Sequence, residues 1–570
     1  MKKTILAVVI VGLGLLLTNI SCDSVTYDEY HEHGCLATSS PIASDIGRQI
    51  LQDGGNAFDA AVAVGFALAV CYPQAGNVGG GGFAVTYSVS NDKISALDFR
   101  ETAPRAASEN MYIDETGEII PESSLLGAKA AGVPGTVAGL HELWREYGSQ
   151  PWDSLLTPAI NLADTGFIVG DYLARSLEEN QDKLAAFPAT REIFFPAGKL
   201  LQAGDRLIQK DLAATLTRIR LDTLKGFYAG KTAALIVEAM KENGGLIDSA
   251  DLAGYHSSWR EPLHFTFDSL DIYSMPPPSS GGIILAMILR LIEPYDFALY
   301  MPESPEFIHL FAEACRLAYA DRAVHLGDPD FIDMPVAELL SDEYLKIRRN
   351  LIDLKRAGNS ARIGSGIPEP TGDSASTTHF SVIDSLGNAV SLTYTINTSF
   401  GSKLVVKGAG FLLNNEMDDF SIKPNEPNYY GLIGGPANAI APGKRMLSSM
   451  CPTIIMKKDR YRRYPYLVLG SVGGSKIITT VAQSIINMTK FELNSIETVR
   501  FPRFHHQWLP DTLYLETGGF DINVKQDLIS RGHIIKEINP YGDLQMIYVA
   551  DSALVSAVSD PRRDGASRGY

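Results

Sequence analysis

The chain has 570 residues, of which 45% are hydrophobic and 20% are charged, which is typical of a globular protein with a large core. Its formal net charge is −17, so its overall field disfavours binding to nucleic acid or to anionic lipid. The sequence therefore gives no indication of a nucleic-acid partner.

The N-terminus is typical of an exported bacterial protein. Two lysines precede a 13-residue apolar run over residues 5–17, which has the length of a signal-peptide core and is too short to span a bilayer comfortably. Residues 19–22 then resemble a lipoprotein cleavage site with Cys22 as the lipidated residue, although asparagine stands where that pattern usually has leucine. We expect a signal peptide over residues 1–22 and a periplasmic or membrane-anchored protein. Lipidation of Cys22 and plain cleavage both stay open, and no later segment predicts a transmembrane helix.

The first two-thirds of the chain alternate between helical and strand patterns. Residues 57–70 are apolar nearly all round, which predicts a buried helix, and a glycine run at residues 76–82 follows it. The other elements predicted here are helices over residues 39–51, 135–147, 207–219 and 283–292, strands over 83–88 and 262–275, and mainly helical structure over 304–350.

A compositional change divides this part from the rest. Residues 355–376 are rich in Gly, Ser, Pro and Asp, which indicates either an ordinary interdomain linker or a flexible tail in front of a processing site. The elements predicted after it are strands over 378–384, 389–396, 453–457, 466–471 and 545–549 and helices over 475–488 and 495–500. Helical stretches that alternate with two groups of strands predict a layered α+β or α/β body.

Two adjacent threonines, Thr377 and Thr378, stand where this polar run ends and a strand begins. A threonine hydroxyl is a poor nucleophile until a base lies beside it, and a free α-amine on the same residue would supply that base. If the chain is cut between Ser376 and Thr377, the protein is an N-terminal-threonine hydrolase or transferase.

The segment after Thr377 is interpreted as a β-hairpin. A three-residue loop at 385–387, with glycine at its left-handed position, sets a register that pairs apolar residues with apolar ones. That register places Thr377 opposite Thr395 and beside Asn397. The alternative is a plain half-buried hairpin whose threonines reflect β-propensity alone.

Four further polar groups are candidates for a site. Acids and amides at residues 414–419 could hold an ammonium group, and a metal is less favoured because no histidine accompanies them. Gly473 and Gly474, between a predicted strand and a predicted helix, could stabilise an oxyanion. Arg100 could clamp a carboxylate at the end of a strand, and residues 448–449 supply paired hydroxyls. Taken singly, each group also has an ordinary structural explanation.

Cysteines and histidines give weaker signals. The cysteines after the leader have no CxxC spacing and predict no disulfide framework. His31, His33 and Cys35 have a metal-like spacing without an evident fourth ligand, and the pair at residues 505–506 is interpreted as structural. No metal site is therefore predicted.

Together these motifs resemble the γ-glutamyltransferase (γ-glutamyltranspeptidase) family over nearly the whole chain after the leader. The resemblance is carried by residues 54–61, 79–83, 98–104, 377–382, 414–420, 447–450 and 473–475. It implies a four-layer αββα sandwich of the N-terminal nucleophile hydrolase type, without a cofactor. It also implies self-cleavage into a large chain, residues 23–376, and a small chain, residues 377–570, that form a heterodimer.

The resemblance further implies a role for each candidate residue. Thr377 would attack the γ-carbonyl of glutathione or another γ-glutamyl compound, its α-amine would act as base, and the acyl group would pass to water or to an amino-acid or peptide acceptor. The other implied roles are nucleophile support by Thr395, the oxyanion hole by Gly473 and Gly474, α-carboxylate binding by Arg100, Ser448 and Ser449, α-ammonium binding by Asn397, Glu416 and Asp419, and a lid over residues 424–435 that contains Tyr430.

Two other functions remain open from the sequence. A related acylase that removes glutaryl or another acyl group from a β-lactam side chain would share the fold and nucleophile. The acids at residues 416 and 419 argue against it, because glutaryl has no ammonium group to pair with them. A non-catalytic surface lipoprotein with the same fold is the second alternative.

Overall fold

The computed structural model describes residues 29–364, 377–423, 426–460, 462–550 and 554–570. The predicted signal peptide, Cys22 and Ser376 lie outside the described residues, as do two positions of the predicted lid.

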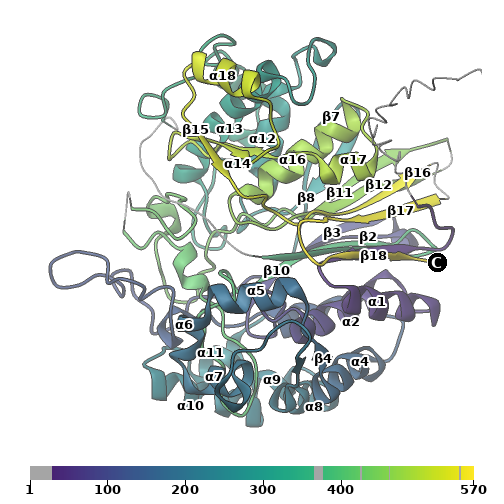
Figure 1. The fold of residues 1–570 in the computed structure, drawn as a ribbon, viewed down its shortest axis with the longest axis vertical. Coiled ribbons are helices and arrows are strands. Elements are labelled where there is room, and N and C mark those ends of the chain that lie inside the picture. The colour runs from purple at the N-terminus through teal and green to yellow at the C-terminus, as the bar shows by residue number, and fades with distance from the viewer. Residues whose placement is uncertain (1–28, 365–376, 424–425, 461, 551–553) are drawn as a thin grey trace, which may run out of the picture.

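The protein is built of four layers, with two β-sheets stacked face to face between two layers of helices (Figure 1). The seven-stranded sheet has the order β18(Ala566–Gly569), β1(Cys35–Thr38), β9(Thr378–Ile383), β10(Ala389–Thr395), β2(Gly81–Ser88), β3(Lys93–Phe99), β6(Ser258–Arg260). The six-stranded sheet has the order β17(Leu554–Ser559), β16(Gln545–Ala550), β12(Arg463–Gly470), β11(Thr453–Lys458), β8(Leu270–Ser274), β7(Leu263–Phe267). This is the predicted αββα sandwich.

Helices from the first half of the chain cover the outer face of the seven-stranded sheet (Figure 1). They are α1(Pro41–Gln52), α2(Ala57–Cys71), α3(Thr136–Tyr147), α4(Trp152–Thr165), α5(Asp171–Glu179), α6(Gln181–Ala185), α7(Pro188–Phe194), α8(Lys210–Asp222), α9(Lys225–Tyr228), α10(Gly230–Asn243) and α11(Ser249–Gly254). A two-stranded sheet, β4(Phe167–Ile168) with β5(Arg206–Leu207), lies among them.

Later helices cover the outer face of the six-stranded sheet. They are α12(Gly281–Ile292), α13(Pro305–His325), α14(Val336–Leu339), α15(Asp342–Arg349), α16(Lys476–Thr489), α17(Ser495–Arg500) and α18(Ile522–Ser530). A small sheet, β13(Phe504–His505), β14(Leu513–Glu516) and β15(Ile535–Ile538), completes this layer.

The helix α2 shows how local sequence and burial act together. Asn56 caps it by accepting from the backbone N–H groups of Phe58 and Asp59, and Asp59 accepts from the N–H of Asn56, which completes a capping box. Every residue of α2 is buried, so it crosses the core as an apolar rod with no solvated face. The all-round apolar pattern of residues 57–70 predicted this correctly.

The predicted hairpin register is confirmed. Phe380 faces Leu392, His379 faces Thr393 and Thr378 faces Tyr394, so one further step along the ladder brings Thr377 to Thr395. Gly387 has φ of 90°, the left-handed conformation that the loop was expected to need. The site prediction therefore rests on a correct alignment of the two strands.

Strands at both ends of the described chain were not predicted. β1 pairs with β9 on one side and with β18 on the other, so the C-terminal residues close the sheet next to the strand that follows Thr377. Both strands are four residues long, which is too short for a period-two pattern to stand out.

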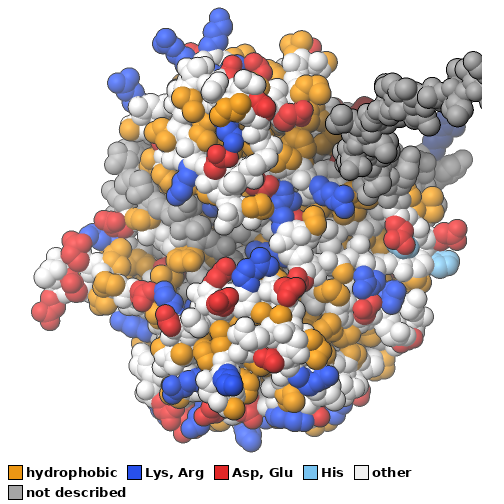
Figure 2. Space-filling view, viewed as in Figure 1, with side chains coloured by type: hydrophobic (Ala, Val, Ile, Leu, Met, Phe, Trp, Pro, Cys, Tyr) orange, Lys and Arg blue, Asp and Glu red, His pale blue; other side chains and the backbone are white. Residues whose placement is uncertain are grey.

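The surface carries charges of both signs, and the described cysteines are buried. On the face in Figure 2, Lys and Arg side chains are interspersed with Asp and Glu. Cys35, Cys71, Cys315 and Cys451 are buried free thiols, in line with the absence of a predicted disulfide framework. Within the described ranges, no helix has both the length and the apolar character needed to cross a membrane.

Candidate active site

The predicted site residues come together in a narrow cavity at one end of the two sheets. Arg100 follows β3, Thr377 precedes β9 and Thr395 ends β10, while Gly474 lies between β12 and α16. The cavity is lined by Arg100, Arg322, Thr377, Thr395, Asn397, Glu416, Asp419, Tyr430, Ser448, Ser449 and Gly474, together with apolar neighbours and Ser475. Every predicted site residue in the described part of the chain is here except Gly473, which adjoins the lining residue Gly474.

The two threonines are held where the hairpin enters this cavity. Thr377 is buried, with 3% of its surface exposed. The hydroxyl of Thr395 accepts from the backbone N–H of Asn397 at 2.8 Å. Asn397 adopts a left-handed conformation with φ of 73°, which asparagine tolerates better than most residues, so the chain turns directly after β10.

The glycine run before β2 lets the backbone approach this hairpin closely. A Cβ atom at Gly80 would lie 2.0 Å from the carbonyl oxygen of Thr395, a distance that no side chain can occupy. The amide of Asn414 donates to the carbonyl groups of Gly79 and Gly132 at 2.8 Å each, and so fastens the acidic segment to the same loop. The glycines therefore position Thr395 and do not line the cavity.

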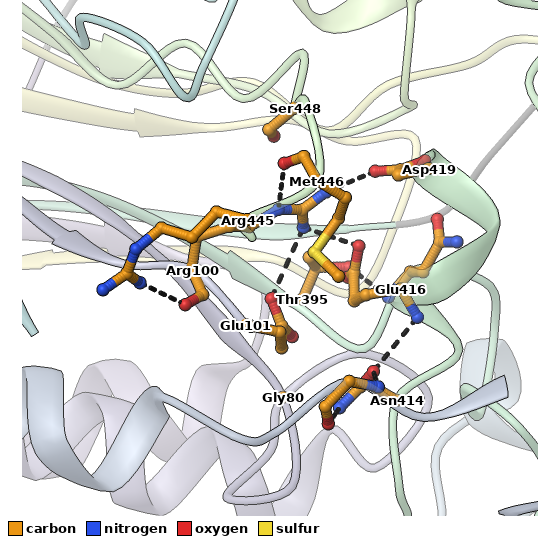
Figure 3. Close-up of polar contacts among 12 residues, drawn as sticks. Gly80, Arg100, Glu101, Thr395, Asn414, Glu416, Asp419, Arg445, Met446 and Ser448 are labelled. Carbon is orange, nitrogen blue, oxygen red and sulfur yellow. Dashed lines mark hydrogen bonds and ion pairs between the residues drawn. The ribbon is translucent and has the colours of Figure 1, made fainter. Parts of the chain in front are cut away.

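Arg100 lies at the centre of a buried ionic network (Figure 3). Its Nη1 contacts Glu416 Oε2 at 2.5 Å and its Nη2 contacts Asp419 Oδ2. Glu101 Oε2 lies 3.5 Å from Nη1, and Nε donates to the carbonyl of Met446 at 3.2 Å. The resemblance assigns Arg100 to the substrate α-carboxylate and the two acids to its α-ammonium, and the structure adds that Arg100 contacts both acids directly.

One guanidinium cannot neutralise three buried carboxylates. Burial raises the pKa of Glu101 to about 7 and raises the pKa of Glu416 well above its usual range, with Arg100 acting in the opposite direction in both cases. Burial also raises the pKa of Asp419. This end of the cavity therefore carries more acceptor capacity than Arg100 can satisfy, and an additional cation would be stabilised there.

Two buried acceptors in the cavity are left without a hydrogen-bond partner among the described residues. They are Oδ1 of Asn397 and Oε1 of Glu416. An unpaired buried acceptor costs roughly 1–3 kcal/mol, so each is a position where a donor would bind. An ammonium group offers three N–H donors and a positive charge, and suits this pair of oxygens.

The two serines present donors. Ser448 Oγ accepts from the backbone N–H of Met450 at 3.1 Å, and Ser449 Oγ accepts from Nη2 of Arg322 at 3.2 Å. Since each oxygen already accepts from a protein donor, each hydroxyl hydrogen is directed elsewhere. Two hydroxyl donors on one segment suit a carboxylate.

The glycine pair has the geometry that the sequence led us to expect. Gly473 has φ of 119° and Gly474 has φ of 56°, both in the region that favours glycine. The pair leads from β12 into α16, and the N-terminus of a helix carries partial positive charge and unpaired N–H groups. Backbone donors at this position can stabilise negative charge that develops next to Thr377.

Tyr430, which was predicted to belong to a lid, is buried and lines the cavity. Its hydroxyl donates to the carbonyl of Asn397 at 3.0 Å. The side-chain amide of Gln507 donates to the carbonyl of Tyr430 at 3.3 Å and accepts from Ser475 Oγ at 2.6 Å. Gln507 thus links Tyr430 to the start of α16, a contact that no local pattern in the sequence indicated.

A second polar cluster lies away from this cavity. Among the described residues, His309, Glu313 and His533 form the one group of His, Cys, Asp or Glu that is close enough to share an ion. His309 Nδ1 already lies 2.8 Å from His533 Nε2, and both Glu313 oxygens accept from protein donors, one set on Arg316 and the other on the N–H of Gly358. These side chains are therefore already bonded within the protein, and His31, His33 and Cys35 are not part of the group.

Nearly the whole chain is similar to known proteins. A family model described as gamma-glutamyltranspeptidase matches residues 43–570. The chain belongs to this family. The glutathione hydrolase proenzyme of Escherichia coli (strain K12) is 44% identical over 552 residues, which is 96% of this chain and 94% of that protein.

Solved structures show the same fold. The crystal structure of a cephalosporin acylase from Bacillus halodurans aligns with a TM-score of 0.84 at 27% identity, and covers 96% of this chain and 97% of that one. A chain of Helicobacter pylori gamma-glutamyltranspeptidase aligns with a TM-score of 0.57 at 44% identity and covers 58% of this chain and 95% of its own length. Family membership and the N-terminal nucleophile hydrolase sandwich are thereby confirmed.

Proposed function

We propose that the protein is a self-processing γ-glutamyltransferase and glutathione hydrolase, with Thr377 as its nucleophile. It would cleave the γ-glutamyl amide of glutathione and related compounds and pass the acyl group to water or to an amino-acid or peptide acceptor. The E. coli relative that is named a glutathione hydrolase proenzyme supports both the activity and the processing.

The observation that carries this proposal is the polarity of the cavity around Thr377. Unpaired acceptors of Asn397 and Glu416 are matched to an ammonium group, and the hydroxyl donors of Ser448 and Ser449 are matched to a carboxylate. An α-amino acid carries both groups on one carbon. A γ-glutamyl compound bound by its α-carbon would extend its side-chain carbonyl away from them, toward a nucleophile in the same cavity.

Processing would use the same hydroxyl as catalysis. Thr377 Oγ attacks the carbonyl carbon of Ser376, the peptide C–N bond breaks, and an ester joins Ser376 to Thr377 Oγ. Water then hydrolyses this ester, which leaves a carboxylate on Ser376 and frees both the hydroxyl and the α-amine of Thr377. The amine has a reference pKa of about 7.7–8.0, so roughly a tenth to a sixth of it is unprotonated at pH 7 and available as a base.

Turnover would follow as two acyl transfers. Thr377 Oγ attacks the γ-carbonyl carbon and its proton passes to the α-amine, while N–H groups of the Gly473–Gly474 pair stabilise the oxyanion. The intermediate collapses, the C–N bond breaks, and the leaving amine takes the proton. Water or an acceptor amine then attacks the γ-glutamyl ester and regenerates the Thr377 hydroxyl.

The decisive experiment is the Thr377→Ala variant. We expect a single uncleaved chain on denaturing electrophoresis and no release of p-nitroaniline from γ-glutamyl-p-nitroanilide, because one hydroxyl serves both reactions. Thr377→Ser should retain part of both, since it keeps a hydroxyl and an α-amine. In the wild type, mass spectrometry should find the small chain beginning at Thr377, and normal cleavage of the alanine variant would refute the assignment.

A glutaryl acylase is the second candidate, favoured by the likeness to the solved cephalosporin acylase. The two activities differ in the α-amino group, which glutaryl lacks. Parallel assays with γ-glutamyl-p-nitroanilide and glutaryl-p-nitroanilide separate them. We expect a strong preference for the γ-glutamyl compound, because Glu416 Oε1 and Asn397 Oδ1 would otherwise stay unpaired.

We further propose that the protein is exported, with cleavage before or at Cys22. The lysine pair and the apolar run over residues 5–17 support this. Mass spectrometry of the N-terminus of the mature large chain tests it: a diacylglyceryl-modified Cys22 indicates a lipid anchor, and an unmodified N-terminus near residue 23 indicates a soluble periplasmic protein.

A further inference from the structure

Arg322 is a buried cation in the cavity that the sequence patterns did not single out. It lies in the last turn of α13 with 4% of its surface exposed, and it lines the same cavity as Thr377. Its Nε donates to Ser280 Oγ at 2.8 Å and its Nη2 donates to Ser449 Oγ at 3.2 Å. Both of its hydrogen-bond partners are neutral hydroxyl groups.

Arg322 differs from Arg100 in the negative charges that surround it. Arg100 contacts Glu416, Asp419 and Glu101, whereas no carboxylate within the described residues forms an ion pair with Arg322. Tyr319 and then Asp419 act on the Arg322 pKa in the opposite direction to burial, and Asp419 is itself bound to Arg100. Burial lowers the pKa of Arg322 to about 10, so its guanidinium is still charged at neutral pH.

An unpaired buried charge is costly, and the cost falls when a counter-ion binds. Arg322 therefore supplies the uncompensated positive charge at the serine end of the cavity. Arg100 lies in the same cavity, but its charge is already shared among three carboxyl groups.

Arg322 also fixes the two serines. Ser280, which accepts from Arg322, donates through Oγ and through its backbone N–H to the carbonyl of Ser448, at 2.7 and 2.8 Å. Ser449 accepts directly from Arg322, so its own hydroxyl hydrogen is free to donate into the cavity. One guanidinium thus holds both Ser448 and Ser449 in place.

We propose that Arg322 is a specificity-determining residue that positions Ser448 and Ser449 and makes a free α-carboxylate on the substrate a requirement for efficient turnover. The inference rests on the proposed γ-glutamyl activity and adds a residue that positions the serine pair and brings a second positive charge to the carboxylate end of the cavity. Loss of Arg322 is expected to weaken the use of substrates with an α-carboxylate far more than the use of substrates in which this group is neutral.

The test compares two substrates across three proteins. The substrates are γ-glutamyl-p-nitroanilide and its analogue with an α-carboxamide in place of the α-carboxylate. The proteins are the wild type, Arg322→Gln and Arg322→Lys, and the measured quantity is the ratio of kcat/KM for the two substrates. Cleavage into two chains reports correct folding of each variant.

We expect the wild type to prefer the carboxylate substrate at least about 100-fold, in line with a desolvated charge-assisted interaction. Arg322→Gln should lower that ratio at least tenfold, mainly through a higher KM for the carboxylate substrate. Arg322→Lys keeps the charge but not the paired N–H geometry, so its ratio should lie between those of the wild type and Arg322→Gln. The matched control is Arg348→Gln, which removes a buried arginine of α15 that lies outside the cavity and should leave the ratio unchanged.

Three results would overturn the proposal. If Arg322→Gln lowers activity on both substrates equally, Arg322 serves the fold and not the carboxylate. Failure of both Arg322 variants to process would also assign the residue to the fold. An unchanged ratio with full activity would show that Arg100 and the serines suffice. If instead the wild type cleaves neither substrate, the proposed γ-glutamyl activity is what fails.

Discussion

Two buried polar clusters in this protein differ in whether their polar atoms are satisfied. The first is the cavity around Thr377. The second, termed the α13 cluster, comprises His309, Glu313, Arg316, Asp511 and His533. Both join segments distant in the chain and both contain buried arginine, acid and hydroxyl or imidazole groups.

In the α13 cluster, donors and acceptors meet within the protein. Arg316 binds Glu313 and Asp511, and Ser360 donates its backbone N–H to Asp511 at 2.8 Å. Among the described residues, none of the cluster's side-chain atoms is a buried unpaired group. In the same described part of the chain, the cavity holds unpaired oxygens of Asn397 and Glu416 and a cation, Arg322, without an ion pair. Satisfied clusters hold segments together, and unsatisfied ones are suited to binding a ligand.

The difference between the two clusters can be tested by mutation, and the largest loss of stability is expected at Glu313. We predict that Glu313→Ala lowers the free energy of unfolding by about 3 kcal/mol, because Arg316 loses a buried counter-charge and the N–H of Gly358 loses its acceptor. Urea denaturation measures the change. KM for γ-glutamyl-p-nitroanilide should stay within twofold of the wild type, and Glu313→Gln should be destabilised less. A change in KM without loss of stability would contradict the assignment of Glu313 to the structural cluster.

The corresponding change in the cavity is Glu416→Ala. We predict that it raises KM for γ-glutamyl-p-nitroanilide about 10- to 100-fold, since a charge-assisted hydrogen bond to the α-ammonium is worth roughly 1.5–3 kcal/mol. Stability should change little, because Arg100 keeps its contact with Asp419 and one unpaired oxygen is removed. Glu416→Gln retains an oxygen acceptor, so its KM should lie between those of the wild type and Glu416→Ala. A large loss of stability with unchanged KM would place Glu416 with the structural residues.

A smaller effect is expected at His379, a buried histidine between the two sheets. Its Nδ1 lies 2.7 Å from Thr393 Oγ1 and its Nε2 lies 3.1 Å from Ser381 Oγ, so it belongs with the satisfied groups. Burial lowers its pKa to about 3. Between that value and the ordinary value near 6.5 the unfolded chain binds the additional proton, so stability falls as the pH is lowered through this window.

Between these two pKa values, His379 changes the free energy of unfolding by about 1.4 kcal/mol for each pH unit. Urea denaturation of the wild type and of His379→Gln at pH 7, 6 and 5 measures it. The difference in unfolding free energy between the two proteins should narrow by that amount for each unit as the pH falls below about 6.5. Parallel curves for the two proteins would show that His379 is protonated in the fold and would contradict this prediction.

Much of the fold was predictable from local sequence. The all-round apolar pattern of α2, the glycine-containing hairpin loop and the period-two strands β9 and β10 set their structure within a few residues, because burial and turn chemistry act locally. The short strands β1 and β18 were not predictable, because their pairing depends on partners hundreds of residues away.

The same division holds for the site. The sequence by itself singled out Thr377, Thr395, the Gly473–Gly474 pair and the acidic segment as candidates, since each stands at a strand end or turn where its residue type is informative. Only the tertiary structure decided that Arg100 lies against Glu416 and Asp419, and that Arg322 holds Ser448 and Ser449. The physical reason is that charge compensation depends on which side chains share a buried volume, and the residues just named come from four separate segments of the chain.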